Sequence, residues 1–368
     1  MKKKILFIIW SYTYGGGAES LLTMIVNNLN PDKYDISIIE YEHAEIKTEP
    51  VNSYVHILPY IKAVDTPEKY SKTYQLYNTP EVLIDTYIKG DYDLYISFNY
   101  QIPTFLLPKR TKNISWIHGD VYDLMEENSL RERKRQDKAF EKVSKIVAIS
   151  DRTEKSLIDL FPNHQHKIIK IYNSVNIEKI REDSLKHSEI QLRNPSILFV
   201  GRLEEGKNPI RLVNVLRLVH QYGIKAHLYY MGHGELKDSI LEQAETYHLS
   251  QFVHLLGYQK NPFPVIRQCN VTCLLSKQEG FSMSLLESVA LDIPFIATEI
   301  GGARELSNGQ RCGCIIDTDE EAAQGICEWI KRDKAQIKAE CRESIKRFEL
   351  KDYIEKIEKL FDSVMRED

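Results

Sequence analysis

The sequence predicts an α/β protein built from two doubly wound domains, each a parallel sheet covered by helices. The chain has 368 residues, which suits two domains of about 150 residues each. Short apolar runs alternate along it with segments of helical periodicity, which is the rhythm of β-α-β units. This rhythm pauses over the polar stretch 180–195. We therefore expect domains over 1–180 and 195–350, with the carboxyl ends of both sets of strands facing a central cleft.

The first domain is expected to begin with a strand over Ile5–Trp10. Apolar residues follow it at the spacing of one helix face, at Ala18, Leu21, Leu22, Ile25 and Leu29. Apolar runs bounded by polar residues predict further strands over 35–40, 94–98, 113–117 and 145–150.

The second domain is expected to begin with a strand over Ser196–Gly201. Further strands are predicted over 226–231, 252–256, 270–275, 294–298 and 314–316. The segment 351–367 is strongly periodic and predicts an amphipathic helix. Its apolar face consists of Tyr353, Ile354, Ile357, Leu360, Phe361 and Val364.

Composition excludes several classes of protein. Hydrophobic residues make up 42% and charged residues 28% of the chain, which is typical of globular domains and not of disordered or fibrous chains. The net charge is -4 and neither half has a basic excess, so we expect no nucleic-acid partner. The apolar run near the start is too short for a secretory signal, and no run approaches the ~20 residues of a membrane span. We therefore expect a cytoplasmic protein.

Six cysteines lie in the second half of the chain. Cys269 with Cys273, and Cys312 with Cys314, are conceivable zinc ligands, but their spacings differ from the usual CxxC pairs. Cys273 also lies within an apolar run. We favour small core residues over a zinc site and expect no metal.

A glycine-rich motif, Tyr14–Ser20, follows the first predicted strand and opens a helix. Glycine lets a backbone approach a ligand closely, and a helix N-terminus offers N–H groups to an anion. A plain tight turn is the alternative interpretation. The motif lacks the GxGxxG pattern, which disfavours a dinucleotide oxidoreductase.

A second motif, Gly201–Asn208, follows the first strand of the second domain. Arg202 and Lys207 are five residues apart across its glycine-containing loop. A guanidinium and an ammonium group directed at one anion would suit a diphosphate. A solvated charged loop is the alternative, which the position at the end of a strand disfavours.

A third motif begins with Glu279 and Gly280 after a buried strand and runs to Glu287 in the next helix. Two carboxylates at this spacing could act as acid and base, or could accept hydrogen bonds from the hydroxyls of a ligand. A surface position on the helix is the alternative for Glu287.

Taken together, these motifs make the chain similar to the retaining GT-B glycosyltransferases of family 4 over essentially its whole length. The motifs that carry the resemblance are the N-terminal glycines, Gly201-Arg202 with Lys207, 232–235, the E-x7-E pair Glu279 and Glu287, and 301–305. The resemblance implies a Rossmann-like acceptor domain over 1–180 and a Rossmann-like nucleotide-sugar domain over 195–350. It also implies that the last helix, 351–368, returns to the first domain.

The resemblance also implies roles for single residues. Arg202 and Lys207 would hold the diphosphate, Glu287 the ribose, and Glu279 the hydroxyls of the transferred sugar. His118, which follows a predicted strand, would face that sugar and act in catalysis with Arg202, Lys207 and Glu279. The remaining donor-binding residues would be Gly16, Gly17, Gly201, Gly232, Tyr258, Gln259, Gly280, Phe281, Ser282 and Met283.

Two positions depart from the family pattern. The family often has glycine where Ser282 stands, so a positive φ there would cost free energy. The family's Asn-Gly-Val-Asp is here Asn173-Ser174-Val175-Asn176, which lacks the final carboxylate.

The function we expect is transfer of a hexose or N-acetylhexosamine from a nucleotide-sugar, preferably a UDP-sugar, to a saccharide acceptor without a cofactor. A lipid-linked acceptor in the synthesis of a bacterial surface polysaccharide such as a capsule is the favoured setting. A nucleotide-sugar epimerase of the same fold and a non-catalytic partner of an active transferase are the alternatives.

Three further segments have weaker interpretations. Asp91 and Asp93 match a metal-binding DxD motif, but they precede a strand, which is the wrong end for a parallel-sheet site. The basic segment 131–138 and the segment 106–110 are candidates for peripheral contact with the anionic inner face of the cell membrane. A solvated helix face is the alternative for 131–138, whose cations are Arg131, Arg133, Lys134, Arg135 and Lys138.

Overall fold

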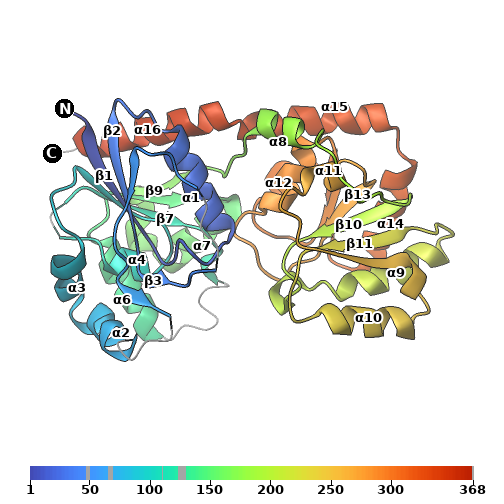
Figure 1. Cartoon of the computed structure of the whole chain (residues 1–368), viewed down its shortest axis with the longest axis horizontal. Helices are drawn as coiled ribbons and strands as arrows, with labels where there is room; N and C mark the ends of the chain where they lie inside the picture. Colours follow the sequence, from blue (N-terminus) through green and yellow to red (C-terminus); the bar gives the residue numbers. More distant parts are fainter. Residues whose placement is uncertain (47–49, 65–68, 110, 123–129, 367–368) are drawn as a thin grey trace. The chain divides into compact units, whose positions relative to one another are not determined.

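The computed structural model describes residues 1–46, 50–64, 69–109, 111–122 and 130–366. The chain divides into two compact units, one formed by Met1–Asn173 with Lys351–Asp368 and the other by Ser174–Leu350 (Figure 1). The first segment thus ends at Asn173 and not at residue 180. The expected linker over 180–195 is wrong at its start, because helix α8 (Ile177–Asp183) belongs to the second unit. The Arg181 side chain anchors this helix by donating to the carbonyl of Ala290 at 3.0 Å.

The first unit contains a seven-stranded parallel sheet with the strand order β4-β2-β1-β6-β7-β8-β9. Its strands are β1 (Lys3–Ile9), β2 (Tyr34–Glu40), β4 (Val55–Ile57), β6 (Leu94–Ser97), β7 (Asn113–Ile117), β8 (Lys145–Ala148) and β9 (Ile168–Lys170). A separate pair is formed by β3 (Glu42–His43) and β5 (Lys62–Ala63). Every strand expected in this half is present, whereas β3, β4, β5 and β9 escaped prediction because two or three residues show no periodicity.

Helices of this unit connect successive strands. They are α1 (Gly17–Asn28), α2 (Lys69–Asn78), α3 (Pro80–Tyr87), α4 (Ile102–Phe105), α6 (Leu130–Phe140), α7 (Asp151–Leu160) and the 3₁₀ turn η1 (Pro162–Lys167). The last helix of the chain, α16 (Leu350–Arg366), also packs here. Its Phe361 ring lies 6.2 Å from that of Phe7 and 6.0 Å from that of Tyr34, and Lys33 pairs with Asp362 at 2.8 Å. The return of the final helix to the first domain is thereby confirmed.

The second unit has a six-stranded sheet with the order β12-β11-β10-β13-β14-β15, again parallel. Its strands are β10 (Ser196–Val200), β11 (His227–Met231), β12 (Val253–Gly257), β13 (Val271–Leu274), β14 (Phe295–Ala297) and β15 (Gly313–Ile315). All six were expected from the sequence. The doubly wound α/β class is thereby confirmed for both units.

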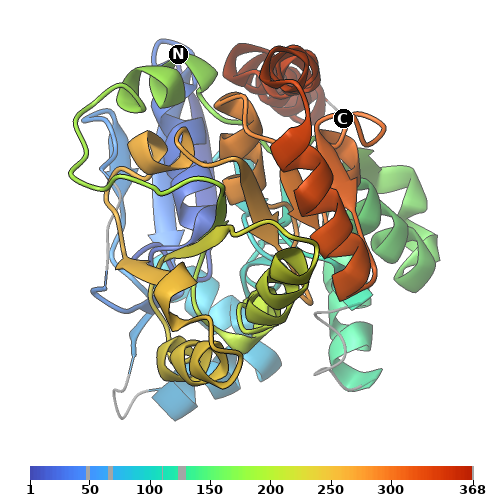
Figure 2. The same cartoon turned by 90° about the vertical axis from the view of Figure 1, so that its right-hand side faces the viewer.

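Helices cover this second sheet as well. They are α9 (Arg211–Gln221), α10 (Lys237–Thr246), α11 (Phe263–Ile266), α12 (Met283–Ala290), α13 (Ala303–Leu306), α14 (Asp319–Lys331) and α15 (Lys334–Ile345), with 3₁₀ turns η2 (Glu205–Lys207), η3 (Ser250–Phe252) and η4 (Lys346–Phe348). Figure 2 looks onto this unit, where α9 (yellow-green) and α14 (red-orange) lie together against the sheet. Arg211 and Asn214 of α9 both donate to the Asp319 carboxylate at the start of α14.

Candidate active site

Glycines bring the loops after β10, β11 and β12 into backbone contact. Gly232 has a φ of +151°, and a Cβ there would lie 1.9 Å from the carbonyl oxygen of Gly201. The Gly201 N–H donates to the carbonyl of Met231 at 3.1 Å, and the Gly232 N–H to that of Gly257 at 3.0 Å. Any side chain at residue 232 would therefore separate the loops. The structure brings the expected residues Gly201 and Gly232 together at the carboxyl edge of the sheet.

A second close approach joins the loops after β13 and β14. A Cβ on Gly301 would lie 1.9 Å from the carbonyl oxygen of Gly280. The Gly301 N–H donates to the carbonyl of Glu279 at 3.2 Å. Gly301 thus determines where Glu279 and Gly280 lie, although its motif contributed no residue to the expected site. The consecutive glycines at 301 and 302 were the signal for it.

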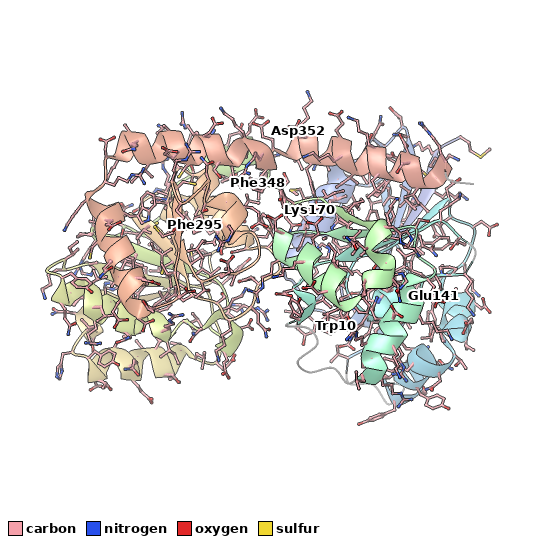
Figure 3. All side chains as sticks on the ribbon, turned by 180° about the vertical axis from the view of Figure 1, so that it is seen from behind. Trp10, Glu141, Lys170, Phe295, Phe348 and Asp352 are labelled. Atoms are coloured by element: carbon pink, nitrogen blue, oxygen red, sulfur yellow. The ribbon has the colours of Figure 1, made fainter. Side chains whose placement is uncertain are left out.

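Ser282 starts helix α12 and does not strain the backbone. Its φ is -73°, so the cost of a positive φ does not arise, and its Oγ accepts from the Leu285 N–H at 3.4 Å. The Ser282 N–H donates to the carbonyl of Gly301 at 3.3 Å. This N–H is therefore bonded within the chain, and the assignment of Ser282 to the donor remains a prediction. Phe281 is buried beside it, with its ring 5.8 Å from that of Phe348, which Figure 3 labels.

Lys207 and Glu279, which the sequence assigns to the diphosphate and the sugar, contact each other directly. The Lys207 ammonium donates to Glu279 Oε1, and the Ser276 hydroxyl donates to the same oxygen at 3.3 Å. Both charged side chains are largely buried, so each compensates the desolvation of the other.

The loops that carry this ion pair are joined through their backbones. The Lys277 N–H donates to the carbonyl of Gly206 at 2.8 Å. The Thr298 hydroxyl donates to the carbonyl of Ser276 at 2.6 Å. Ser276 was missed from the sequence, where a serine at the end of a buried strand was the available signal. The loops after β10, β13 and β14 therefore form one frame around the ion pair.

Arg202 does not share an anion with Lys207. Its side chain is 67% exposed and pairs with Glu204 at 2.9 Å. The two cations of the motif thus have separate carboxylate partners, and the expectation that both point at one group is not met among the described residues. Arg202 projects into solvent at the same loop, where an anionic ligand could displace Glu204 from it.

Glu287 lies in the second turn of α12 and is half-buried. Burial raises the pKa of its carboxyl group to about 7. Among the described residues, no cation or hydrogen-bond donor compensates this carboxylate. The interpretation as a solvated surface residue is therefore wrong. A half-buried carboxylate without a donor suits a ligand that brings hydroxyl groups.

Tyr258 and Gln259 follow β12 after Gly257, whose φ is +69°. The Gln259 amide donates to the carbonyl of Leu256 at 2.8 Å, so it closes its own turn. The Tyr258 ring is exposed and meets the His233 ring edge-on at 6.1 Å. Of these two expected residues, Tyr258 is thus the one whose ring is presented to solvent.

His118 follows β7 in the first unit. Its ring lies 4.3 Å from that of Phe98, and its Nε2 is buried with no hydrogen-bond partner among the described residues. Burial lowers the pKa of His118 to about 3, so the imidazole is neutral at pH 7. The following loop is held by Asp120, which pairs with Arg152 of α7. This unsatisfied ring nitrogen distinguishes His118 from a satisfied structural histidine.

The glycine motif of the first unit differs from its expected role. The N–H of Gly16 donates to the Glu19 carboxylate at 2.9 Å, and a Cβ on Gly16 would lie 2.7 Å from that carboxylate. The Gly16 N–H is therefore bonded to Glu19 within the chain, and the assignment of Gly16 and Gly17 to the donor remains a prediction. Gly17 begins helix α1, whose first turn already contains the negative charge of Glu19.

Glu40 is a structural residue at this edge of the sheet that sequence reasoning missed. This buried carboxylate accepts from the N–H groups of Tyr12 at 2.7 Å and Thr13 at 3.2 Å. The Thr13 hydroxyl donates to it at 3.1 Å. Glu40 therefore holds the loop after β1 in place. An acidic residue at the end of a predicted strand was the signal for it.

Asp93 anchors the amino edge of the first sheet. It accepts from the Lys3 ammonium at 3.0 Å and from the Lys4 N–H at 2.8 Å. The second aspartate of the DxD motif is thus bonded to residues of strand β1. Asn176, at the position of the missing carboxylate, caps α8 by accepting from the Lys179 N–H at 2.9 Å.

Five of the six cysteines are buried, as expected for core residues, and Cys314 is half-buried. Within the described ranges, no three His, Cys, Asp or Glu side chains are arranged to hold a metal ion. None of the helices described is both long and apolar enough to cross a bilayer.

The two candidate membrane segments fare differently. Leu106 and Leu107 are completely buried, so the expectation that they contact a membrane is wrong. Arg110, at the end of this segment, lies outside the described residues. In α6, Arg133 donates to the carbonyl of Leu160 at 2.7 Å and Arg135 to Glu132 at 2.7 Å. The cations that remain exposed on α6 are Arg131, Lys134 and Lys138.

Residues 180–348 match the family described as glycosyl transferases group 1. A protein of Campylobacter jejuni, N-acetylgalactosamine-N,N'-diacetylbacillosaminyl-diphospho-undecaprenol 4-alpha-N-acetylgalactosaminyltransferase, is 31% identical over 198 residues, 53% of this chain and 53% of that protein. The O-antigen biosynthesis glycosyltransferase WbnH of Escherichia coli is 30% identical over 176 residues, 48% of this chain and 47% of its own length. The chain thus matches about half the length of these curated relatives.

A solved structure resembles the chain over nearly its full length. Alr3699/HepE of Anabaena in complex with UDP has a TM-score of 0.75 and 18% identity, and the match covers 99% of this chain and 100% of that one. At this identity the likeness concerns the fold. Residues 180–348 are therefore similar to the glycosyl transferases group 1, and the chain has the GT-B fold.

Proposed function

We propose that the chain is a retaining glycosyltransferase that moves a hexose or N-acetylhexosamine from a UDP-sugar to a saccharide acceptor. The observation that carries this proposal is the arrangement of Lys207, Glu279 and Glu287 at the carboxyl edge of a group 1 domain. It offers an ammonium group for phosphate and carboxylates for hydroxyls. The similar fold of a protein crystallised with UDP supports UDP as the nucleotide.

In this proposal the donor replaces the internal ion pair. The Lys207 ammonium leaves Glu279 for the diphosphate, and Arg202 leaves Glu204 for the same anion. Glu279 then accepts hydrogen bonds from the sugar, while Glu287 accepts from the ribose, with Tyr258 beside the base. The backbone at Gly201, Gly232, Gly280 and Met283 borders the donor. In the absence of donor, Glu279 and Glu204 thus occupy the positions beside Lys207 and Arg202 that the phosphates are proposed to take.

Transfer is proposed to occur on one face of the sugar. The bond from the anomeric carbon to the diphosphate oxygen breaks while a bond to the acceptor oxygen forms, and the acceptor proton passes to the departing diphosphate. Lys207 and Arg202 stabilise the charge that develops on the leaving group. The neutral His118 imidazole is proposed to hydrogen-bond the transferred sugar. Positioning and charge stabilisation then account for the rate.

A lipid-linked saccharide is the proposed acceptor, in bacterial surface polysaccharide synthesis. The name of the Campylobacter relative contains such a substrate, a diphospho-undecaprenol. Exposed apolar side chains lie on α2 (Tyr70 and Tyr74) and at the start of α6 (Leu130). Arg135 of α6 stacks at 4.6 Å on Tyr77 of α2, so the two helices are neighbours.

This surface, Tyr70, Tyr74 and Leu130 with Arg131 and Lys134, is proposed to contact the anionic inner face of the membrane. Replacing both cations by alanine should weaken sedimentation with phosphatidylglycerol vesicles. Sedimentation unchanged by these substitutions would contradict membrane contact at this surface without affecting the proposed activity.

Donor binding and turnover test the proposed activity. Thermal unfolding is recorded with UDP-, GDP- and ADP-sugars, and a UDP-sugar at 100 times its Kd should stabilise the chain by ~2.7 kcal/mol. The stabilising sugar is then incubated with saccharides, and release of UDP with a new α-linked product is expected. An epimerised donor without release of UDP would identify an epimerase. Binding without any turnover would favour a non-catalytic partner.

A further inference from the structure

Two stacked aromatic pairs lie at the carboxyl edge of the first sheet. The rings of Trp10 and Tyr14 lie 5.6 Å apart at 23°, in the loop after β1. The rings of His43 and Tyr60 lie 4.5 Å apart at 9°, on segments that follow β2 and β4. Trp10 is 38% exposed, and Tyr14 and Tyr60 are each 43% exposed. Large aromatic faces gathered in solvent at the ligand edge of a parallel sheet indicate a binding surface.

The backbone beneath these rings is held by internal hydrogen bonds. The Trp10 N–H donates to Asn99 Oδ1 at 3.0 Å, and its carbonyl accepts from the Glu42 N–H at 2.8 Å. The Thr13 hydroxyl accepts from the Ala44 N–H at 2.8 Å, which ties the loop after β1 to the segment that presents His43. The exposed rings are therefore preorganised, so little ordering entropy is lost on binding.

We infer that Trp10 and Tyr14, together with His43 and Tyr60, form a stacking surface for the sugar rings of the acceptor. The inference rests on the proposed function, because only a transferase has an acceptor. A pyranose has an apolar C–H face, which packs on an aromatic ring, and a rim of hydroxyls, which needs hydrogen-bonding groups. The Glu45 carboxylate is 84% exposed, contacts His43 Nε2 at 3.4 Å and supplies such a group beside the rings.

Charge favours a neutral saccharide over an anionic ligand at this surface. Glu40 and Glu45 both contact His43, and Glu19 occupies the first turn of the adjoining helix. These carboxylates disfavour a phosphate or an anionic lipid headgroup in contact with the rings. The stacking surface thus differs in character from the cationic loop that carries Lys207.

The stacking surface continues toward His118 through one intervening strand. The strand order β1-β6-β7 places the ends of β1 and β7 on either side of β6, about 10 Å apart at two strand spacings. Asn99 after β6 accepts from the Trp10 N–H, and Phe98 lies 4.3 Å from the His118 ring. A saccharide stacked on Trp10 would therefore extend along this edge toward His118, which we propose contacts the transferred sugar.

Tryptophan fluorescence tests the inference without requiring activity. Of the chain's three tryptophans, Trp116 and Trp329 are buried, so Trp10 alone reports on solvent-exposed binding. The full chain is titrated with methyl α-glycosides of N-acetylglucosamine, N-acetylgalactosamine and galactose. A saturable change in emission is expected with at least one glycoside, and none is expected in Trp10→Phe. The absence of a saturable change with all three glycosides would overturn the inference.

Transfer to the responding glycoside provides the second measurement. Trp10→Ala and Tyr14→Ala should each raise its KM roughly 10-fold, which corresponds to ~1.4 kcal/mol. Trp10→Phe should retain most of the affinity, and UDP binding should be unchanged in all variants. Tyr222→Ala, which removes an exposed ring from the second unit, is the matched control and should leave KM unchanged.

The outcomes separate this inference from its competitors. An unchanged KM in both alanine variants would overturn the stacking role. Loss of vesicle binding in Trp10→Ala, with no glycoside response in the native chain, would assign the rings to lipid and also overturn it. A glycoside response in a chain that neither binds nor turns over any nucleotide-sugar would support the saccharide surface while contradicting the proposed transferase activity.

Discussion

The loops after β1 and after β10 occupy equivalent places in the two units but have opposite electrostatics. Each follows the first long strand of a parallel sheet and contains glycine. In the first unit, the N–H groups of Tyr12, Thr13 and Gly16 donate to the carboxylates of Glu40 and Glu19. In the second unit the loop instead carries the cations Arg202 and Lys207, each beside a carboxylate.

This difference indicates that a glycine-rich loop at a strand end is not by itself sufficient to predict an anion site. A carboxylate on the same chain can occupy the N–H groups and cancel the positive end of the helix. Where lysine and arginine are added, the loop can exchange an internal carboxylate for a phosphate. This contrast supports the proposals of a neutral saccharide at the first edge and an anionic donor at the second.

The largest expected effect is a loss of stability of the first unit when the packing of helix α16 is disrupted. Phe361 of α16 is fully buried between Phe7 and Tyr34, so Phe361→Ala should destabilise this unit by about 3–5 kcal/mol. Urea unfolding followed by circular dichroism measures this loss. Lys359→Ala, an exposed position on the same helix, is the control and should change stability by less than about 0.5 kcal/mol. Equal stability of the two variants would show that the first unit does not require α16.

Removing the cation of the second loop should lower turnover. Lys207→Ala should reduce kcat about 100-fold, equivalent to ~3 kcal/mol, because the leaving diphosphate loses a charge-assisted contact. Lys277→Ala is the matched control, since Lys277 lies in the adjoining loop and pairs with exposed Glu205 at 2.7 Å. Its kcat should stay near the native value. Equal losses in both variants would mean that general positive charge, and not Lys207, supports turnover.

Acid should destabilise the first unit through His118. Its pKa is about 3 in the folded chain, while the unfolded chain has a histidine pKa of about 6.5. Below pH 6.5 the unfolded state therefore binds a proton that the folded state excludes, so stability falls as the pH decreases. At pH 5 the free energy of unfolding should be lower by about 1–2 kcal/mol for this reason. His118→Gln should remove that part of the acid sensitivity in urea unfolding at pH 5 and 8, and an unchanged difference between these pH values would refute the buried neutral imidazole.

Glu287 should make the stability of the second unit depend on pH in the opposite direction, and this is the smallest effect expected. Its folded pKa is raised from 4.5 to about 7, so the unfolded state loses its proton first as the pH increases. Stability should then fall between pH 4.5 and 7, by about 1 kcal/mol after allowance for partial exposure. Glu287→Gln should abolish this fall, as measured by thermal unfolding across the same range. If the glutamine variant followed the native profile, the carboxyl group would have to be solvated in the folded chain.

Much of the fold could be predicted because its signals are local. The runs at Ile5–Trp10 and Ser196–Gly201 contain enough apolar residues to define strands, and the face that includes Phe361 defines the last helix. By contrast, the boundary at Asn173 depends on α8 packing against the second unit, where Arg181 reaches Ala290. Such contacts between distant segments have no local pattern.

The sequence by itself determined the α/β class and the two sheets, and it predicted two ligand-binding motifs, one with Lys207 and one with Glu279 and Glu287. Only the tertiary structure decided how the hydrogen-bonding capacity of each motif is used. It directed the Gly16 N–H to Glu19, the Ser282 N–H to Gly301 and Lys207 to Glu279. The physical reason is that buried donors and acceptors must be paired, and the partner is chosen by proximity across loops and not by spacing along the chain.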